Sequence, residues 1–318
     1  MGPRGPATVM RQSRTVTSTA QWVAGARPRT LPAAVAPVLV GTSVAMWHDG
    51  AILGRALLAL VVSLGLQVGV NYANDYSDGV RGTDHARVGP VRLVGQGLAT
   101  PSAVKAAALA SFAVAAAAGL ALVVMSGQWW LLLVGAAAIL AAWTYTGGPA
   151  PYGYAGLGEV FVFVFFGLAA VCGTALVQCG LVSALALLCG TGVGALSCAI
   201  LVVNNLRDIP GDTLAGKRTL AVRLGDPATR RLYAALIGVA LAVPALVGLA
   251  GSLAPTAWPA SAILGLGSVL VAVAPLRLVR EGAAGRDLVP VLGATGRLLL
   301  VYGVLLSVGI AVSPLIRT

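Results

Sequence analysis

A short segment of this chain places side-chain oxygens at helical spacing. Asn71, Asp75 and Asp78 are separated by four and three positions, so they would share one face of a helix, and Asp84 follows six residues later. Carboxylates that gather in a partly dry place repel one another, and desolvation protonates some of them unless cations are present. The segment therefore predicts a cation site.

A second segment has the same character. Asn204, Asp208 and Asp212 are spaced four apart, and Asn205 follows the first of them. Pro210 predicts that the helix ends or kinks there, so the last spacing need not be helical. Both segments read as an asparagine, spaced aspartates, a glycine and a basic loop, which is too little to establish an internal repeat.

Oxygen ligands without histidine or cysteine favour hard cations, of which Mg²⁺ is the usual choice. Magnesium keeps several waters and bridges one or two carboxylates to substrate phosphates. The two segments thus predict Mg²⁺ held by Asp75, Asp78, Asp208 and Asp212, which would also be the catalytic residues, with a diphosphate between them. Together with Asp84, these residues account for five of the ten acidic residues of the chain.

Basic residues follow each acidic segment. Arg81 and Arg87 come after the first, and Lys217 and Arg218 come after the second. Their charges would neutralise the leaving oxygens of a diphosphate. The alternative is that the acids only pair with these neighbours on a solvated rim, but acids close to the hydrocarbon are costly and mark functional sites.

The composition predicts that lipid is the solvent of this chain. Of its 318 residues, 58% are hydrophobic and 10% are charged, whereas soluble domains carry about 25% charged residues. The net charge of +11 would indicate nucleic acid in a soluble protein. The basic residues lie between apolar stretches, which predicts a multi-pass membrane protein and no nucleic-acid partner. The four cysteines have no metal-binding spacing.

The apolar stretches predict an all-α polytopic protein with nine transmembrane helices, N-terminus in the cytoplasm. Each stretch approaches the roughly 20 residues that a span requires. In this arrangement every lysine and arginine except Arg55 and Arg317 falls on one side, as the positive-inside rule demands. The predicted spans are residues 30–47, 54–74, 102–126, 129–146, 156–178, 181–206, 229–251, 258–279 and 292–314.

Both acidic segments then lie at cytoplasmic helix ends, which predicts an active site that faces the cytoplasm from the cell membrane. Residues 1–21 are rich in Ser, Thr and Arg and predict a disordered cytoplasmic tail, and residues 22–318 form the membrane domain.

From about residue 21 to the end, the chain resembles the intramembrane UbiA-type prenyltransferases. Within this family it is most similar to the branch that acts on 1,4-dihydroxy-2-naphthoate in menaquinone synthesis. Besides the two acidic segments, the resemblance lies in residues 26–32 (ARPRTLP), 82–84 (GTD), 88–93 (VGPVRL), 145–149 (YTGGP), 151–154 (PYGY), 158–159 (GE) and 216–220 (GKRTL).

The resemblance implies helices around a central cavity and Mg²⁺ as cofactor. The donor would be an all-trans polyprenyl diphosphate, and the acceptor 1,4-dihydroxy-2-naphthoate would lose its carboxylate to give demethylmenaquinone. Tyr72, Tyr76 and Tyr145 could stabilise an allylic cation by cation–π contact. The predicted substrate-binding residues are Asn71, Arg81, Asp84, Tyr145, Asn204, Asn205, Lys217 and Arg218.

Two alternatives remain open from the sequence. The same chemistry could act on another acceptor, namely 4-hydroxybenzoate, homogentisate, haem or a sugar phosphate. The chain could instead be a cation-coupled transporter with the acids as ion sites, but such sites usually lie near the bilayer midplane, often at broken helices. The acidic segments here stand at helix ends beside basic loops, which suits a diphosphate better.

Overall fold

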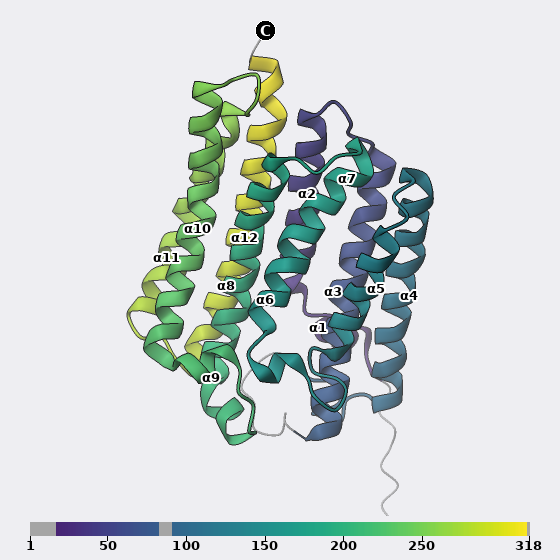
Figure 1. Cartoon of the computed structure of the whole chain (residues 1–318). Helices are drawn as coiled ribbons and strands as arrows, with labels where there is room; N and C mark the ends of the chain where they lie inside the picture. Colours follow the sequence, from purple (N-terminus) through teal and green to yellow (C-terminus); the bar gives the residue numbers. More distant parts are fainter. Residues whose placement is uncertain (1–16, 83–90, 317–318) are drawn as a thin grey trace, which may run out of the picture.

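The computed structural model describes residues 17–82 and 91–316, and these form a bundle of helices without a strand (Figure 1). The first half contains α1 (Thr19–Gly25), η1 (Pro28–Thr30), α2 (Pro32–Trp47), α3 (Leu53–Arg81), α4 (Pro101–Ser126), α5 (Leu131–Thr144), η2 (Tyr152–Ala155), α6 (Gly158–Val162), the π-helical segment η3 (Phe163–Ala169) and α7 (Ala170–Cys179).

The second half contains α8 (Ala184–Leu214), α9 (Leu220–Leu224), α10 (Asp226–Leu253), η4 (Ala260–Ser268), α11 (Val269–Arg280), η5 (Gly285–Asp287), α12 (Leu288–Val312) and η6 (Ser313–Ile316). Every one of the nine predicted ranges therefore contains a helix. The predicted tail lies mostly outside the described residues, and α1 begins at Thr19, inside the last positions assigned to that tail.

Apolar length agrees with a membrane protein. Among the described residues, seven helices are long and apolar enough to cross a bilayer, or eight if Thr19–Thr30 and Pro32–Trp47, which meet at 51°, form one span. The sequence predicts nine. The difference lies in this bent pair and in α5, which has only 14 residues.

Helix α8 is the centre of the bundle. It packs against α7, α10 and α12, and its apolar residues are mostly buried in one continuous core (Figure 1). Close approach depends on glycines, since a Cβ atom on Gly167 would lie 2.5 Å from the Cα atom of Gly194. Small residues of this kind allow apolar helices to pack closely in lipid, where no hydrophobic effect drives association.

The helices that carry the acidic segments are longer than predicted. Helix α3 continues to Arg81, seven residues past its predicted end, and stops at Gly82, whose φ of 71° is left-handed. Helix α8 does not end at Pro210 but continues through it to Leu214. Residues 71–78 and 204–212 are therefore helical throughout, and both stretches lie at the end of the bundle where α9 is found (Figure 1).

Candidate active site

A cavity of about 1070 Å³ opens among α3, α4, α5, α7 and α8. Its polar end is lined by Asp78, Asn204, Asp212 and Lys217, and the remainder is lined mainly by aliphatic and aromatic side chains. On α3 the lining extends from Asp78 back to Ala59, so at about 1.5 Å per residue the cavity follows the helix for roughly 28 Å. One compartment thus joins a charged end to a long apolar channel.

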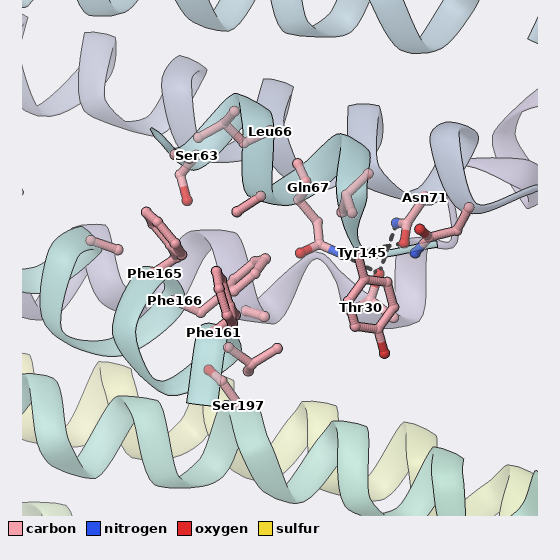
Figure 2. A pocket seen from close by; sticks show the side chains of 18 of the residues that line it. Thr30, Ser63, Leu66, Gln67, Asn71, Tyr145, Phe161, Phe165, Phe166 and Ser197 are labelled. Carbon is pink, nitrogen blue, oxygen red and sulfur yellow. Dashed lines mark hydrogen bonds between the residues drawn. The ribbon is translucent and has the colours of Figure 1, made fainter. Parts of the chain in front are cut away.

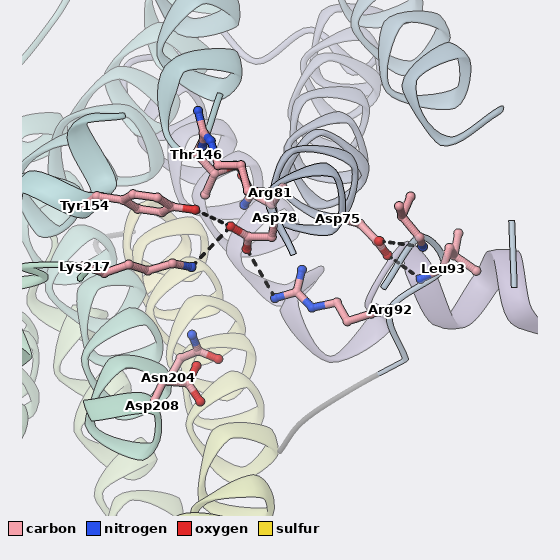
Figure 3. A network of polar contacts seen from close by, with 12 residues as sticks. Asp75, Asp78, Arg81, Arg92, Leu93, Thr146, Tyr154, Asn204, Asp208 and Lys217 are labelled. Carbon is pink, nitrogen blue, oxygen red and sulfur yellow. Dashed lines mark hydrogen bonds and ion pairs between the residues drawn. The ribbon is translucent and has the colours of Figure 1, made fainter. Parts of the chain in front are cut away.

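Asp78 is the centre of the polar end (Figure 3). The residue is 2% exposed, and its Oδ1 atom accepts hydrogen bonds from the Tyr154 hydroxyl at 2.5 Å and from Lys217 Nζ at 3.2 Å. Arg92 Nη2 lies 3.9 Å from Oδ2. Burial, followed by the nearby Asp78 charge, raises the pKa of Tyr154 well above its ordinary value, so the phenol stays protonated and donates.

Asp75, one turn earlier on α3, has a different environment. Its two oxygens accept hydrogen bonds from the backbone N–H groups of Leu93 at 2.7 Å and Val94 at 3.0 Å. Figure 3 shows the carboxylate directed toward this segment, away from Asp78, and it does not line the cavity. Because Arg92 directly precedes Leu93, Asp75 anchors the segment that brings Arg92 to Asp78.

The second acidic segment divides in a similar way. Asp208 pairs with Arg207: the Arg207 Nε and Nη2 atoms each lie 2.8 Å from one Asp208 carboxylate oxygen. Asp208 does not line the cavity. Asp212, one turn further along α8, does line it. The structure therefore brings Asp78 and Asp212 into the same cavity from two separate helices.

Asn204 and Asn205 use opposite ends of their side-chain amides to bind their protein partners. Arg207 Nη2 donates to Asn204 Oδ1 at 2.8 Å, and Asn205 Nδ2 donates to Glu159 Oε1 at 3.0 Å. An arginine can only donate, so Arg207 fixes the Asn204 amide, and the Glu159 carboxyl accepts from the Asn205 amide nitrogen. Asn204 keeps its amide nitrogen for the cavity, whereas Asn205 keeps its oxygen.

A polar cluster with an aromatic wall lies further along the cavity (Figure 2). Asn71 Nδ2 donates to the Ala26 carbonyl and to Thr30 Oγ1, and Gln67 lies one turn deeper on the same face of α3. Tyr145 lines the cavity here. The other two tyrosines named from the sequence do not: Tyr72 donates to the Trp22 carbonyl, and Tyr76 stacks on a tryptophan ring.

Two further predicted residues, Arg81 and Arg218, do not line the cavity. Arg81 donates to the carbonyls of Thr146 and Gly148 and does not line the cavity. The Arg218 side chain does not line it either. Asp84, like Arg87, lies outside the described residues.

Sequence reasoning missed several cavity residues. Tyr154 lies in the PYGY segment, and Arg92 lies in the VGPVRL segment. The sequence alone does not identify either residue as part of the site, because their contacts with Asp78 join residues far apart in the chain. Gln67 had one available signal, since it precedes Asn71 by one turn on the same helical face. No feature of the sequence predicts the contact between Glu159 and Asn205.

The side chains at the polar end fit a magnesium ion better than zinc. The acids and amides supply oxygen atoms, and no histidine or cysteine lines the cavity among the described residues. In this same part of the chain, no three acidic, histidine or cysteine residues gather closely enough to hold a metal by themselves. Magnesium commonly binds in this way, through one or two carboxylates together with phosphates of the substrate.

Comparison with known proteins identifies the family of this chain. The profile of the UbiA prenyltransferase family matches residues 34–288. A 1,4-dihydroxy-2-naphthoate octaprenyltransferase of Mycobacterium tuberculosis (strain ATCC 25618 / H37Rv) is 52% identical over 298 residues, which covers 94% of this chain and 99% of the relative.

Solved structures agree on the fold. The apo UbiA homolog of Aeropyrum pernix K1 is 19% identical, with a TM-score of 0.65 over 88% of this chain and 97% of the other. A UbiA homolog of Archaeoglobus fulgidus, solved with GPP and Mg²⁺ bound, is 15% identical, with a TM-score of 0.62 over 90% of this chain and 99% of the other. The chain belongs to the UbiA prenyltransferase family.

Proposed function

We propose that this protein transfers a polyprenyl group from an all-trans polyprenyl diphosphate to 1,4-dihydroxy-2-naphthoate, with loss of diphosphate and CO₂. The observation that carries the proposal is the single cavity, whose charged end suits a diphosphate and whose apolar length suits a polyprenyl chain. The acceptor follows from the name of the relative that is 52% identical over nearly the whole chain.

We assign the metal to the oxygens of Asp78 and Asp212, because these are the motif acids that line the cavity. The sequence predicts Asp75 and Asp208 as further ligands, but Asp75 accepts from backbone N–H groups and Asp208 pairs with Arg207, so the metal is not assigned to them. When bound, Mg²⁺ would supply a Lewis acid that neutralises charge on the departing diphosphate. Lys217, within reach of Asp78, adds a positive charge at the same end, and Arg92 adds another.

Prenyl transfer breaks one bond to the prenyl carbon and forms another. The allylic C–O bond breaks, and its electron pair leaves with the diphosphate. The ring carbon that bears the carboxylate forms a bond to the prenyl carbon, and the carboxylate then departs as CO₂ while its bonding pair restores the aromatic ring. The product is a prenylated naphthohydroquinone, and demethylmenaquinone is its oxidised form.

The apolar walls serve this chemistry because an allylic cation exposed to water would become an alcohol. Tyr145 and Phe161 place aromatic faces in the cavity and would stabilise the cation by cation–π contact. Asn204 offers an N–H donor for a substrate oxygen, and Asn205 offers an acceptor for a substrate hydroxyl. Arg81, Arg218 and Asp84 are retained as predicted substrate-binding residues.

We further propose that the bent pair and α5 each cross the membrane, which makes nine spans with the N-terminus in the cytoplasm. The arginines beside both acidic segments support this orientation, because basic residues concentrate on the cytoplasmic side. The polar end of the cavity would then face the cytoplasm from the cell membrane.

The test is the product mass formed by purified protein with a polyprenyl diphosphate, Mg²⁺ and a panel of aromatic acceptors. We expect the decarboxylated naphthohydroquinone from 1,4-dihydroxy-2-naphthoate, and no product after EDTA treatment until Mg²⁺ is restored. Product from 4-hydroxybenzoate or homogentisate, with the naphthoate inert, would overturn the choice of acceptor.

A further inference from the structure

Gln67 presents a hydrogen-bond acceptor to the middle of the cavity (Figure 2). Its side chain lies on α3 and is 5% exposed, yet it lines the cavity beside the aromatic rings of Tyr145 and Phe161. Figure 2 shows its nitrogen directed toward Thr30 and Asn71 and its oxygen on the opposite side. No role in the diphosphate chemistry above accounts for this residue.

Two backbone carbonyls fix the orientation of the Gln67 amide. Thr30 Oγ1 donates to the Arg27 carbonyl at 2.9 Å, which leaves its lone pairs to accept. Asn71 Nδ2 donates to the Ala26 carbonyl at 2.9 Å and to Thr30 Oγ1 at 3.1 Å, so Asn71 Oδ1 can only accept. Carbonyl oxygens cannot donate, and therefore none of these groups can reverse its role.

Gln67 closes this circuit of hydrogen bonds. Its Nε2 atom donates to Thr30 Oγ1 at 2.9 Å and to Asn71 Oδ1 at 3.4 Å, which uses both amide protons. Rotating the amide by 180° would place an acceptor against two acceptors. The Oε1 atom has no hydrogen-bond partner among the described residues and is held toward the cavity.

An acceptor in a mostly apolar cavity costs stability unless water or a ligand satisfies it. A diphosphate cannot do so, because its oxygens also accept. A prenyl chain has no donor. A hydroxyl group on an aromatic ring is a donor, and the rings of Tyr145 and Phe161, which line the same cavity, are surfaces on which such a ring could stack.

We propose that Gln67 Oε1 accepts a hydrogen bond from the hydroxyl at position 4 of the acceptor ring, which stands para to the hydroxyl next to the carboxylate. Gln67 thereby selects a dihydroxy acid over a monohydroxy acid. The inference rests on the proposed function for the identity of the acceptor. Thr30 and Asn71 are positioning residues, because they act through the Gln67 amide.

The test compares the binding of two acids, so that it does not depend on turnover. The dissociation constants of 1,4-dihydroxy-2-naphthoate and of 1-hydroxy-2-naphthoate, which lacks the second hydroxyl, are measured by titration calorimetry without prenyl diphosphate. We expect Gln67→Met, which keeps the length of the side chain but loses the acceptor, to weaken binding of the dihydroxy acid about tenfold. Binding of the monohydroxy acid and the KM for the prenyl diphosphate should change less than about twofold.

A second pair of variants guards against misfolding of Gln67→Met. Thr30→Val removes the group that fixes the amide and should lose part of the discrimination between the two acids, whereas Thr30→Ser keeps the hydroxyl and should restore it. Equal weakening of both acids by Gln67→Met, or no weakening of either, would overturn the inference. Product formation by the wild-type protein tests the proposed function separately.

Discussion

The two acidic segments, which look alike in sequence, contain two kinds of aspartate. Asp78 on α3 and Asp212 on α8 line the same cavity, whereas Asp75 is bound by two backbone N–H groups and Asp208 by Arg207. The difference teaches that helical spacing alone does not assign a role. Asp75 and Asp208 hold their donors away from the cavity and stabilise the walls of the site, whereas Asp78 faces the cavity while it accepts hydrogen bonds from Tyr154 and Lys217.

The largest effect should follow from removing a cavity carboxylate. We expect Asp78→Asn and Asp212→Asn each to lower kcat/KM for prenyl transfer by at least about 100-fold, because the charge that attracts the cation to the diphosphate is lost. The measurement is product formation at fixed Mg²⁺. Asp226→Asn is the matched control, since Asp226 pairs with Arg230 away from the cavity.

Removing the Lys217 charge should have the second-largest effect on activity. Its ammonium lies 3.2 Å from Asp78 Oδ1 and 4.4 Å from the centre of the Tyr154 ring, so Lys217→Met removes a charge that would otherwise meet the diphosphate. We expect a loss of about 10- to 100-fold in kcat/KM, the range for hydrogen bonds to charged groups. Lys217→Arg should recover part of it, and a variant as active as wild type would remove Lys217 from the site.

Asp75→Asn sharpens the comparison between the two kinds of aspartate. The amide keeps one acceptor for Leu93 or Val94 but turns a donor against the other N–H group, so we expect about 1–3 kcal/mol lower stability of the membrane domain. Turnover should fall about tenfold or less, through displacement of Arg92. If turnover vanished while the Tm stayed unchanged, Asp75 would instead be a metal ligand, as the sequence predicts.

The smallest effect concerns Glu159, which holds Asn205 by a 3.0 Å hydrogen bond. Glu159→Leu releases the Asn205 amide, and we expect a loss of about fivefold in kcat/KM. Glu159→Gln keeps an acceptor at this position and should retain most of the activity. Equal losses in both variants would show that the contact does not orient Asn205.

Much of the fold follows from the sequence, because lipid forces each apolar stretch to satisfy its own backbone as a helix. The sequence does not predict the ends of α3 and α8 correctly, because hydropathy falls at Asp75 and at Asp208 although both helices continue. Of the two outcomes predicted at Pro210, an end or a kink, the end is wrong, because α8 continues through this proline to Leu214.

The site follows only in part. Side-chain chemistry predicted that oxygens from α3 and α8 meet at one end of the bundle, and Asp78, Asn204, Asn205, Asp212 and Lys217 line one cavity there. Spacing could not show that Asp75 faces Leu93 or that Arg81 faces the carbonyls of Thr146 and Gly148, because those partners lie in distant loops. Such contacts depend on tertiary packing, which a helical period does not encode.

Asp78 and Asp212 should share one cation with a prenyl diphosphate. Mn²⁺ binding by purified protein in the presence of an unreactive prenyl thiodiphosphate, followed by electron paramagnetic resonance, tests this directly. We predict tight binding by the wild-type protein and by Asp75→Asn, and binding at least about tenfold weaker in Asp78→Asn and in Asp212→Asn. Binding as tight as wild type in both cavity variants would contradict the account.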